Sequence, residues 1–236
     1  MIEIRNLTHI YKGGIIGVED INLTIGKDEV VAVIGVSGAG KSTLLRCINR
    51  LLEPTSGEVF INGKDILHCS NKEVQLIRRT IGMVFQNFNL IRRSLVIQNV
   101  LMGRLGYTYH YNKEDYQIAM ECLRRVKIGD LAYRRTDTLS GGQQQRVGIA
   151  RALAQEPTVI LGDEPVSNLD PTRKHEIMDL LLDIHKQDEV PMVISIHDIE
   201  TAKEYTNRVI GVVKGKVVFD SKLEDLTDEK IVEIFA

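Results

Sequence analysis

One nine-residue stretch constrains the fold more than any other, "GVSGAGKST" at residues 35–43. Its Gly35, Gly40, Lys41 and Ser42 satisfy the spacing GxxxxGK[ST]. The β-branched run "EVVAVIG" precedes it, and "KSTLLRCINRLL" continues with helical spacing of its apolar residues. Small residues let successive backbone N–H groups turn toward phosphate oxygens, and the helix N-terminus adds partial positive charge. The sequence therefore predicts a strand, a phosphate-binding loop and a helix.

The last three positions of this loop each have a predicted contact. Lys41 reaches the β- and γ-phosphates of a nucleotide, Ser42 offers its hydroxyl to Mg²⁺, and Thr43 can donate to the α-phosphate. A glycine-rich turn with an incidental lysine is the competing interpretation, which the full eight-position context disfavours. The predicted ATP-binding set is completed by Gly35, Ser37, Gly38, Ala39 and Gly40.

A second stretch, "TVILGDE" at residues 158–164, is an apolar strand that ends in two carboxylates. Adjacent acidic residues at a strand end are, taken alone, more often solvated turn residues. Together with a phosphate loop they have the form of a Walker B strand. We therefore expect Asp163 to hold Mg²⁺ and Glu164 to polarise water.

The remaining apolar patterns predict an α/β chain. Period-2 alternation predicts antiparallel strands at residues 2–11 and 18–26, and helical spacing dominates residues 94–156. Strand runs at 158–163 and 191–197 flank a helical run, the order expected of a parallel sheet whose ligand lies at its strand ends. A hairpin turning at Lys214-Gly215 and a short helix capped by Thr227 or Asp228 close the chain.

Composition excludes several classes of protein. A formal net charge of −2 gives no global attraction to nucleic acid or anionic lipid. The three cysteines, Cys47, Cys69 and Cys122, lack the spacing of a disulfide frame or zinc site, which fits a reducing cytosol. The first residues lack the apolar core of a signal peptide, and no run approaches the roughly 20 apolar residues of a membrane span. Work at a membrane would require another chain to span it.

With "LSGGQQQRV" between the two Walker elements, the sequence closely resembles the ATP-binding-cassette (ABC) ATPases over nearly its whole length. The resemblance implies a P-loop NTPase fold of the ABC type. In that fold a mixed or parallel core sheet carries an N-terminal antiparallel β subdomain and a helical subdomain. We expect one ABC ATPase domain over residues 1–236. Residues 1–85 and 158–236 form its RecA-like core with the antiparallel subdomain, and about 86–157 form the helical signature subdomain.

The resemblance also implies roles for residues that have ordinary structural explanations on their own. Tyr11 matches the aromatic residue that stacks on adenine, and His197 matches the histidine that contacts the γ-phosphate. Gln86 matches the glutamine that joins core and helical subdomain and senses Mg²⁺ and the attacking water. Asp170 ends "SNLD", which matches the D-loop that crosses a dimer interface. With Glu164 as general base, the implied catalytic set is Glu164, His197, Gln86 and Lys41, and the implied Mg²⁺ set is Ser42, Gln86 and Asp163.

The segment "LSGG" poses a separate question, because a helix N-terminus is ready for an anion but the chain already has a phosphate loop. In ABC ATPases this signature segment meets the γ-phosphate bound to a second copy. The resemblance therefore implies a head-to-tail homodimer with two sandwiched ATP molecules, in which Ser140, Gly141, Gly142 and Gln143 act in trans.

A single cassette without spans is similar to the ATPase subunits of bacterial importers. These sit at the cytoplasmic face of the membrane and dock to permease subunits through the groove near Gln86 and the helical insert. They act only indirectly with a periplasmic or lipid-anchored solute-binding protein. Within importers, the sequence is most similar to phosphonate-importer ATPases, on the evidence of "GRLG" (103–106) and the tail 208–220. The expected cargo is phosphonate or a related phosphorus oxyanion.

Several features depart from the phosphonate pattern. Val36 replaces a common proline, "SNLD" replaces "ASLD" or "SALD", "ISIHDIETAKEY" differs from the "NLH" type, and the segment 106–113 is short. Polar amino-acid importers share "LSGGQQQRV" and are the alternative. A soluble ABC ATPase acting on nucleic acid or ribosomes is a further one. Such proteins usually carry paired cassettes or long coiled-coil insertions, which this sequence lacks, so no nucleic-acid partner is expected.

Overall fold

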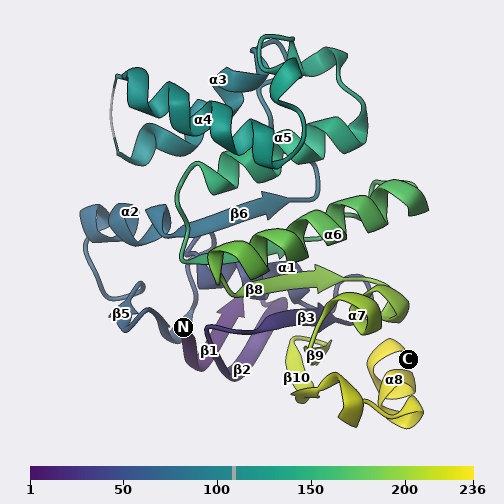
Figure 1. The fold of residues 1–236 in the computed structure, drawn as a ribbon. Coiled ribbons are helices and arrows are strands. Elements are labelled where there is room, and N and C mark those ends of the chain that lie inside the picture. Colours follow the sequence, from purple (N-terminus) through teal and green to yellow (C-terminus); the bar gives the residue numbers. More distant parts are fainter. Residues whose placement is uncertain (108–109) are drawn as a thin grey trace.

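The computed structural model describes residues 1–107 and 110–236. Two sheets and a group of helices make up the fold, with the helices α3, α4 and α5 at the end of the molecule opposite β1 and β2 (Figure 1). The strands of the antiparallel sheet, in the order β2-β1-β4-β5, are Ile16–Ile25, Ile2–Ile10, Ser56–Ile61 and Lys64–Asp65. The strands of the second sheet, in the order β10-β9-β3-β8-β7-β6, are Lys216–Lys222, Arg208–Val213, Val30–Ile34, Met192–Ile196, Val159–Asp163 and Ile81–Phe85.

Eight α-helices and four short 3₁₀ helices connect these strands in the described part of the chain. The α-helices are α1 Lys41–Ile48, α2 Asn71–Arg79, α3 Val96–Leu101, α4 Lys113–Arg125, α5 Gly141–Leu153, α6 Pro171–Asp188, α7 Ile199–Tyr205 and α8 Asp228–Phe235. The 3₁₀ helices are Met102–Gly106, Gly129–Leu131, Thr136–Thr138 and Leu223–Asp225.

The second sheet is mixed, because all its pairs are parallel except β9 with β10. Every residue of β3, β7 and β8 is buried. Such continuous apolar strands are typical of parallel sheets that are covered on both faces. With the antiparallel sheet and the helical group beside it, this arrangement confirms the expected fold class.

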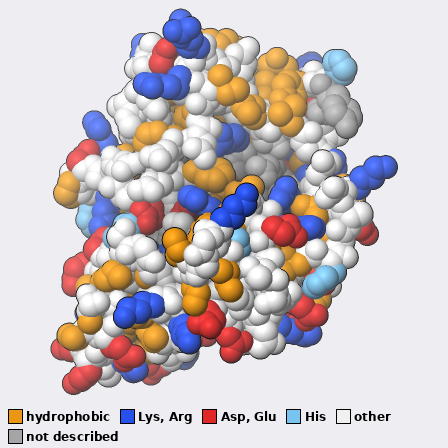
Figure 2. All heavy atoms as spheres, turned by 180° about the vertical axis from the view of Figure 1, so that it is seen from behind, with side chains coloured by type: hydrophobic (Ala, Val, Ile, Leu, Met, Phe, Trp, Pro, Cys, Tyr) orange, Lys and Arg blue, Asp and Glu red, His pale blue; other side chains and the backbone are white. Residues whose placement is uncertain are grey.

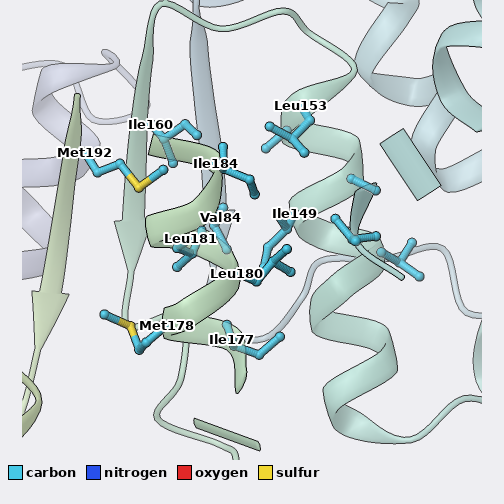
Figure 3. Packing of buried hydrophobic residues seen from close by; sticks show 14 of the residues in the cluster. Val84, Ile149, Leu153, Ile160, Ile177, Met178, Leu180, Leu181, Ile184 and Met192 are labelled. Carbon is cyan, nitrogen blue, oxygen red and sulfur yellow. The ribbon is translucent and has the colours of Figure 1, made fainter. Parts of the chain in front are cut away.

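Alternate residues of β3 serve two hydrophobic clusters, as the period of a strand requires. Val31 and Val33 join the cluster that contains α1 and the antiparallel sheet, whereas Ala32 and Ile34 join the cluster that contains α5 and α6. Figure 3 shows α6 between the sheet and α5, with Ile160 on its sheet side and Ile149 on its α5 side. The core sheet thereby packs against α6, and α6 packs against α5 of the insert.

Three local predictions had mixed outcomes. The hairpin turns at Lys214 and Gly215, and Thr227 caps α8, both as expected. The helix after the phosphate loop is shorter than its apolar spacing predicts. It ends at Ile48, because Arg50 takes a left-handed backbone conformation (φ 53°) that does not continue a helix. Two helices, α2 and α7, were not predicted from the sequence. Within the short segment 106–113, Thr108 and Tyr109 lie outside the described residues.

The "GRLG" motif holds the helical group together. Arg104 is 8% exposed, and its guanidinium contacts Asp115 of α4 (3.0 Å) and Glu156 after α5 (2.7 Å) and donates to the Ala154 carbonyl (3.1 Å). A Cβ on Gly103 would lie 2.4 Å from the Arg151 carbonyl oxygen. The motif therefore joins the segment after α3 to both α4 and α5.

Arg104→Ala is expected to lower the free energy of unfolding by about 3 kcal/mol, because it leaves the buried Asp115 carboxylate without its cation. Urea unfolding followed by circular dichroism measures this change. Arg124→Ala is the matched control, since Arg124 and Glu121 form an exposed pair on α4 that should contribute less than about 1 kcal/mol. Equal losses in the two variants would contradict a structural role for "GRLG".

Candidate functional site

The predicted site residues follow four neighbouring strands. The phosphate loop follows β3, His197 follows β8, Asp163 ends β7 with Glu164 next, and Gln86 follows β6. These strands are adjacent and parallel in the order β3-β8-β7-β6, and the arrowheads of β6 and β8 point the same way in Figure 1. Carboxyl ends of parallel strands meet at one edge of a sheet. The topology therefore brings residues from distant parts of the sequence to one site.

The phosphate loop requires glycine at both ends. Gly35 has φ 149° and a Cβ there would lie 2.3 Å from the Val212 carbonyl oxygen. Gly40 has φ 111° and a Cβ there would lie 2.4 Å from the Gly17 carbonyl oxygen. Gly40 is also the N-cap of α1, and no described side chain caps that helix. The first N–H groups of α1 are thus available to an anion.

Lys41 is directed into the loop. Its Nζ donates to the carbonyl oxygens of Gly35 (2.8 Å) and Val36 (3.0 Å) and lies 3.5 Å from His197 Nδ1. Burial lowers the pKa of the Lys41 ammonium, and the carboxylates of Glu164 and Asp163 oppose that effect. The loop carbonyls hold the ammonium at the phosphate loop, where it and the helix N-terminus that follows can both attract nucleotide phosphates.

Ser42 and Asp163 bring hard oxygen donors together. Ser42 Oγ donates to Asp163 Oδ1 (2.6 Å), and the other carboxylate oxygen of Asp163 accepts from Arg46 (2.9 Å). Asp163 is 2% exposed. A hydroxyl and a carboxylate suit Mg²⁺, which usually completes its shell with substrate phosphates and water. The described residues contain no cluster of three His, Cys, Asp or Glu that could hold a metal by themselves.

Glu164 contacts the predicted γ-phosphate histidine. His197 Nε2 lies 2.5 Å from Glu164 Oε1. A neutral imidazole with its proton on Nε2 satisfies both of its contacts, because Nδ1 can then accept from Lys41. Glu164 has φ 51°, a left-handed conformation that is uncommon for residues with a Cβ. The three side chains of Lys41, His197 and Glu164 form one connected chain.

Tyr11 lies at the exposed edge of the loop. It follows β1, is 38% exposed, and its hydroxyl is 2.8 Å from Thr43 Oγ1. A Cβ on Gly17 would lie 2.7 Å from the Tyr11 ring. Gly17 therefore leaves room for the ring beside Thr43. The base-stacking role of Tyr11 remains a prediction.

Gln86 and the D-loop meet within this chain. The Asn168 side chain donates to the Gln86 carbonyl oxygen (3.2 Å) and to Asn87 Oδ1 (3.2 Å). Asp170 is the N-cap of α6, where its carboxylate accepts from the Arg173 N–H (3.1 Å). The asparagine of "SNLD", which differs from the usual "ASLD" or "SALD", thus links the D-loop to the segment that follows β6 through its side-chain amide.

The signature segment begins α5 in the helical group, apart from α1 (Figure 1). Ser140 is the N-cap, and Gln143 completes a capping box by accepting from the Ser140 N–H (3.0 Å). A Cβ on Gly141 would meet nothing closer than 3.8 Å, whereas one on Gly142 would lie 3.2 Å from the Arg173 side chain. Ser140 is exposed and Gly141 is partly exposed, so a ligand from outside the chain can reach this helix N-terminus.

The sequence reasoning missed two residues of this site. Arg46 pairs with Asp163, and the Ser195 hydroxyl accepts from the Glu164 N–H (2.9 Å). Arg46 looks like an ordinary surface residue of a helix, and Ser195 lies in an apolar strand. Neither contact has a local signal, because each partner is far away in the sequence.

A family profile described as ABC transporter matches residues 18–167, more than half of the chain. The chain therefore belongs to the ABC transporter family and is an ATP-binding-cassette ATPase.

Its most similar relatives include importer subunits. The phosphonates import ATP-binding protein PhnC 1 of Halalkalibacterium halodurans is 48% identical over 242 aligned positions, which cover 100% of this chain and 94% of that protein. The phosphonates import ATP-binding protein PhnC of Shouchella clausii is 49% identical over 100% of this chain and 91% of that protein.

Solved structures agree with this classification. The dimeric cassette MJ0796 is 39% identical with a TM-score of 0.86, covering 94% of this chain and 99% of that chain. Another structure of MJ0796 is described as a dimeric post-hydrolysis state bound to ADP and Pi, at 38% identity and a TM-score of 0.86.

Proposed function

We propose that this chain is the ATP-hydrolysing subunit of a membrane importer for phosphonate or a related phosphorus oxyanion. The observation that carries the proposal is identity of 48% to a phosphonates import ATP-binding protein across the entire chain. The proposed unit is one ABC ATPase domain over residues 1–236, with about 86–157 as its helical signature subdomain.

In the proposed reaction, water attacks the γ-phosphorus of ATP while Glu164 accepts a proton from it. The bond between γ-phosphorus and the bridging oxygen breaks, and ADP and phosphate leave. Lys41 and His197 contact the γ-phosphate, and Gln86 positions the attacking water. Phosphoryl transfer needs little covalent chemistry from a protein, so these groups act by position and charge. The chain of contacts among Lys41, His197 and Glu164 supports this assignment.

We propose Mg²⁺ as the metal of this site. Ser42, Asp163 and Gln86 would hold it, and the hydrogen bond between the Ser42 hydroxyl and Asp163 supports this donor set. When bound, Mg²⁺ neutralises charge on the β- and γ-phosphate oxygens. Arg46 pairs with Oδ2 of Asp163, so Oδ1, the oxygen beside Ser42, is the one that would bind the metal.

We propose that the active unit is a head-to-tail homodimer. Ser140, Gly141, Gly142 and Gln143 of one copy then contact the γ-phosphate held by the other, and the D-loop around Asp170 lies at the interface. The open N-terminus of α5 and the dimeric description of MJ0796 support this arrangement.

The proposed partners are permease subunits, docked near Gln86 and the helical group, and indirectly a solute-binding protein. In the described residues no helix is both long and apolar enough to cross a bilayer. We propose peripheral attachment at the cytoplasmic face of the membrane.

On the face drawn in Figure 2, Lys and Arg side chains are interspersed with Asp and Glu. This mixed surface offers no continuous basic field for nucleic acid there.

Phosphonate uptake tests the proposal. Cells unable to import phosphonates are supplied with this chain, its cognate permease and its solute-binding protein. They are expected to accumulate labelled 2-aminoethylphosphonate, and cells with the Glu164→Gln variant are not, because transport requires hydrolysis. Accumulation of a labelled polar amino acid instead would contradict the phosphonate assignment while leaving the ATPase assignment intact.

A further inference from the structure

A buried hydroxyl lies directly beside the proposed general base. Ser195 belongs to β8, is 1% exposed, and precedes His197 by two residues. Ser195 Oγ and His197 Nε2 both contact Glu164, the residue that follows β7. The role proposed above for the site does not use this hydroxyl.

Ser195 completes the hydrogen bonding where the backbone ladder stops. The last pair of residues between β7 and β8 is Gly162 with Ile194. The Glu164 N–H lies beyond that pair, and Ser195 Oγ accepts its hydrogen bond (2.9 Å). The same hydroxyl donates to the Gly162 carbonyl oxygen (3.4 Å), which directs its lone pairs toward Glu164. One side chain thus bridges both sides of the turn that carries Glu164.

That turn needs an external anchor. Glu164 has φ 51°, and residues with a Cβ persist in this region only when their surroundings hold them there. The Glu164 backbone is held through Ser195, and its carboxylate is held through His197 at 2.5 Å. Both contacts come from one short segment, Ser195 in β8 and His197 directly after that strand.

We propose that Ser195 is a positioning residue for ATP hydrolysis. Its hydroxyl fixes the peptide N–H of Glu164 and so aims the Glu164 carboxylate at the attacking water. This inference rests on the proposed role of Glu164 as general base. The hydrogen bonds of Ser195 join it to Gly162 and Glu164, outside the phosphate loop, so its removal should affect turnover and not ATP affinity.

Ser195→Ala is expected to lower kcat for phosphate release at least about tenfold and to leave KM for ATP within twofold, since small displacements of a catalytic group reduce rates strongly. Ser195→Cys replaces the hydroxyl by a thiol of similar size, whose sulfur is a weak hydrogen-bond acceptor. This variant should lose activity in the same way. Ser195→Thr keeps the hydroxyl and should recover most of the rate. Thr206→Val is the matched control, because it removes a buried hydroxyl that donates to the Ala202 carbonyl oxygen.

The Glu164→Gln background separates positioning from general packing. If Ser195 acts through Glu164, adding Ser195→Ala to Glu164→Gln should leave the residual single-turnover rate unchanged. A further tenfold loss in that background would overturn the proposal. So would wild-type kcat in both Ser195→Ala and Ser195→Cys. Near-normal hydrolysis by Glu164→Gln alone would instead refute the proposed function of Glu164.

Discussion

Glu164→Gln is expected to nearly abolish steady-state ATP hydrolysis while ATP still binds. A positioned general base contributes about 10²–10⁴-fold to a rate, so kcat should fall by that factor. The phosphate loop and Lys41 are unchanged in this variant, so affinity for ATP should stay within about twofold. Phosphate release measures turnover, and equilibrium titration with a fluorescent ATP analogue measures binding.

The geometry explains why glutamine is the informative replacement. The amide has the size of the carboxylate and can still accept from His197, so the contact with the imidazole can persist while the basic oxygen is lost. Glu176→Gln is the matched control, because that glutamate is exposed on α6 and pairs with Arg146. Retention of near-normal hydrolysis by Glu164→Gln would assign the base to another group.

Local chemistry made much of this site predictable. The phosphate loop needs glycine where the backbone is left-handed and crowded, as at Gly35 and Gly40, and it needs a strand before and a helix after. Continuous apolar runs such as β7 predict buried parallel strands, and acidic residues at their ends predict the site edge. These signals depend on residues that are neighbours in the chain, so the fold class could be predicted from the sequence alone.

Contacts between distant segments could not be predicted in the same way. Ser195 meets Glu164, Asn168 meets Gln86, and Arg46 meets Asp163 only because the sheet order places their strands and helices together. The length of α1 was overestimated, since its apolar spacing continues past the left-handed residue Arg50 that follows the helix. Periodicity records which faces are buried and not where the backbone turns.

ATP is expected to convert the Glu164→Gln variant from monomer to dimer, and ADP is not. The N-terminus of α5 carries about half a positive charge, and a helix terminus contributes up to about 2 kcal/mol to a partly buried anion. Two such ends meet two γ-phosphates in the proposed sandwich, so the contacts exist only while ATP remains intact. Size-exclusion chromatography with light scattering measures the mass in each nucleotide. Equal masses with ATP and ADP would argue against the sandwich.

Gly141→Asp should remove the dimer without harming the monomer. A Cβ at Gly141 meets nothing closer than 3.8 Å, and a carboxylate in the first turn of a helix is favourable, so folding should be unaffected. The same carboxylate would oppose a γ-phosphate from a second copy. In the Glu164→Gln background we expect a monomer with ATP, and in the wild-type background at least a tenfold loss of hydrolysis with unchanged ATP affinity. Gln117→Glu adds one negative charge to an exposed position of α4 and should change neither. An ATP-dependent dimer of the Gly141→Asp variant would show that α5 does not act across the interface.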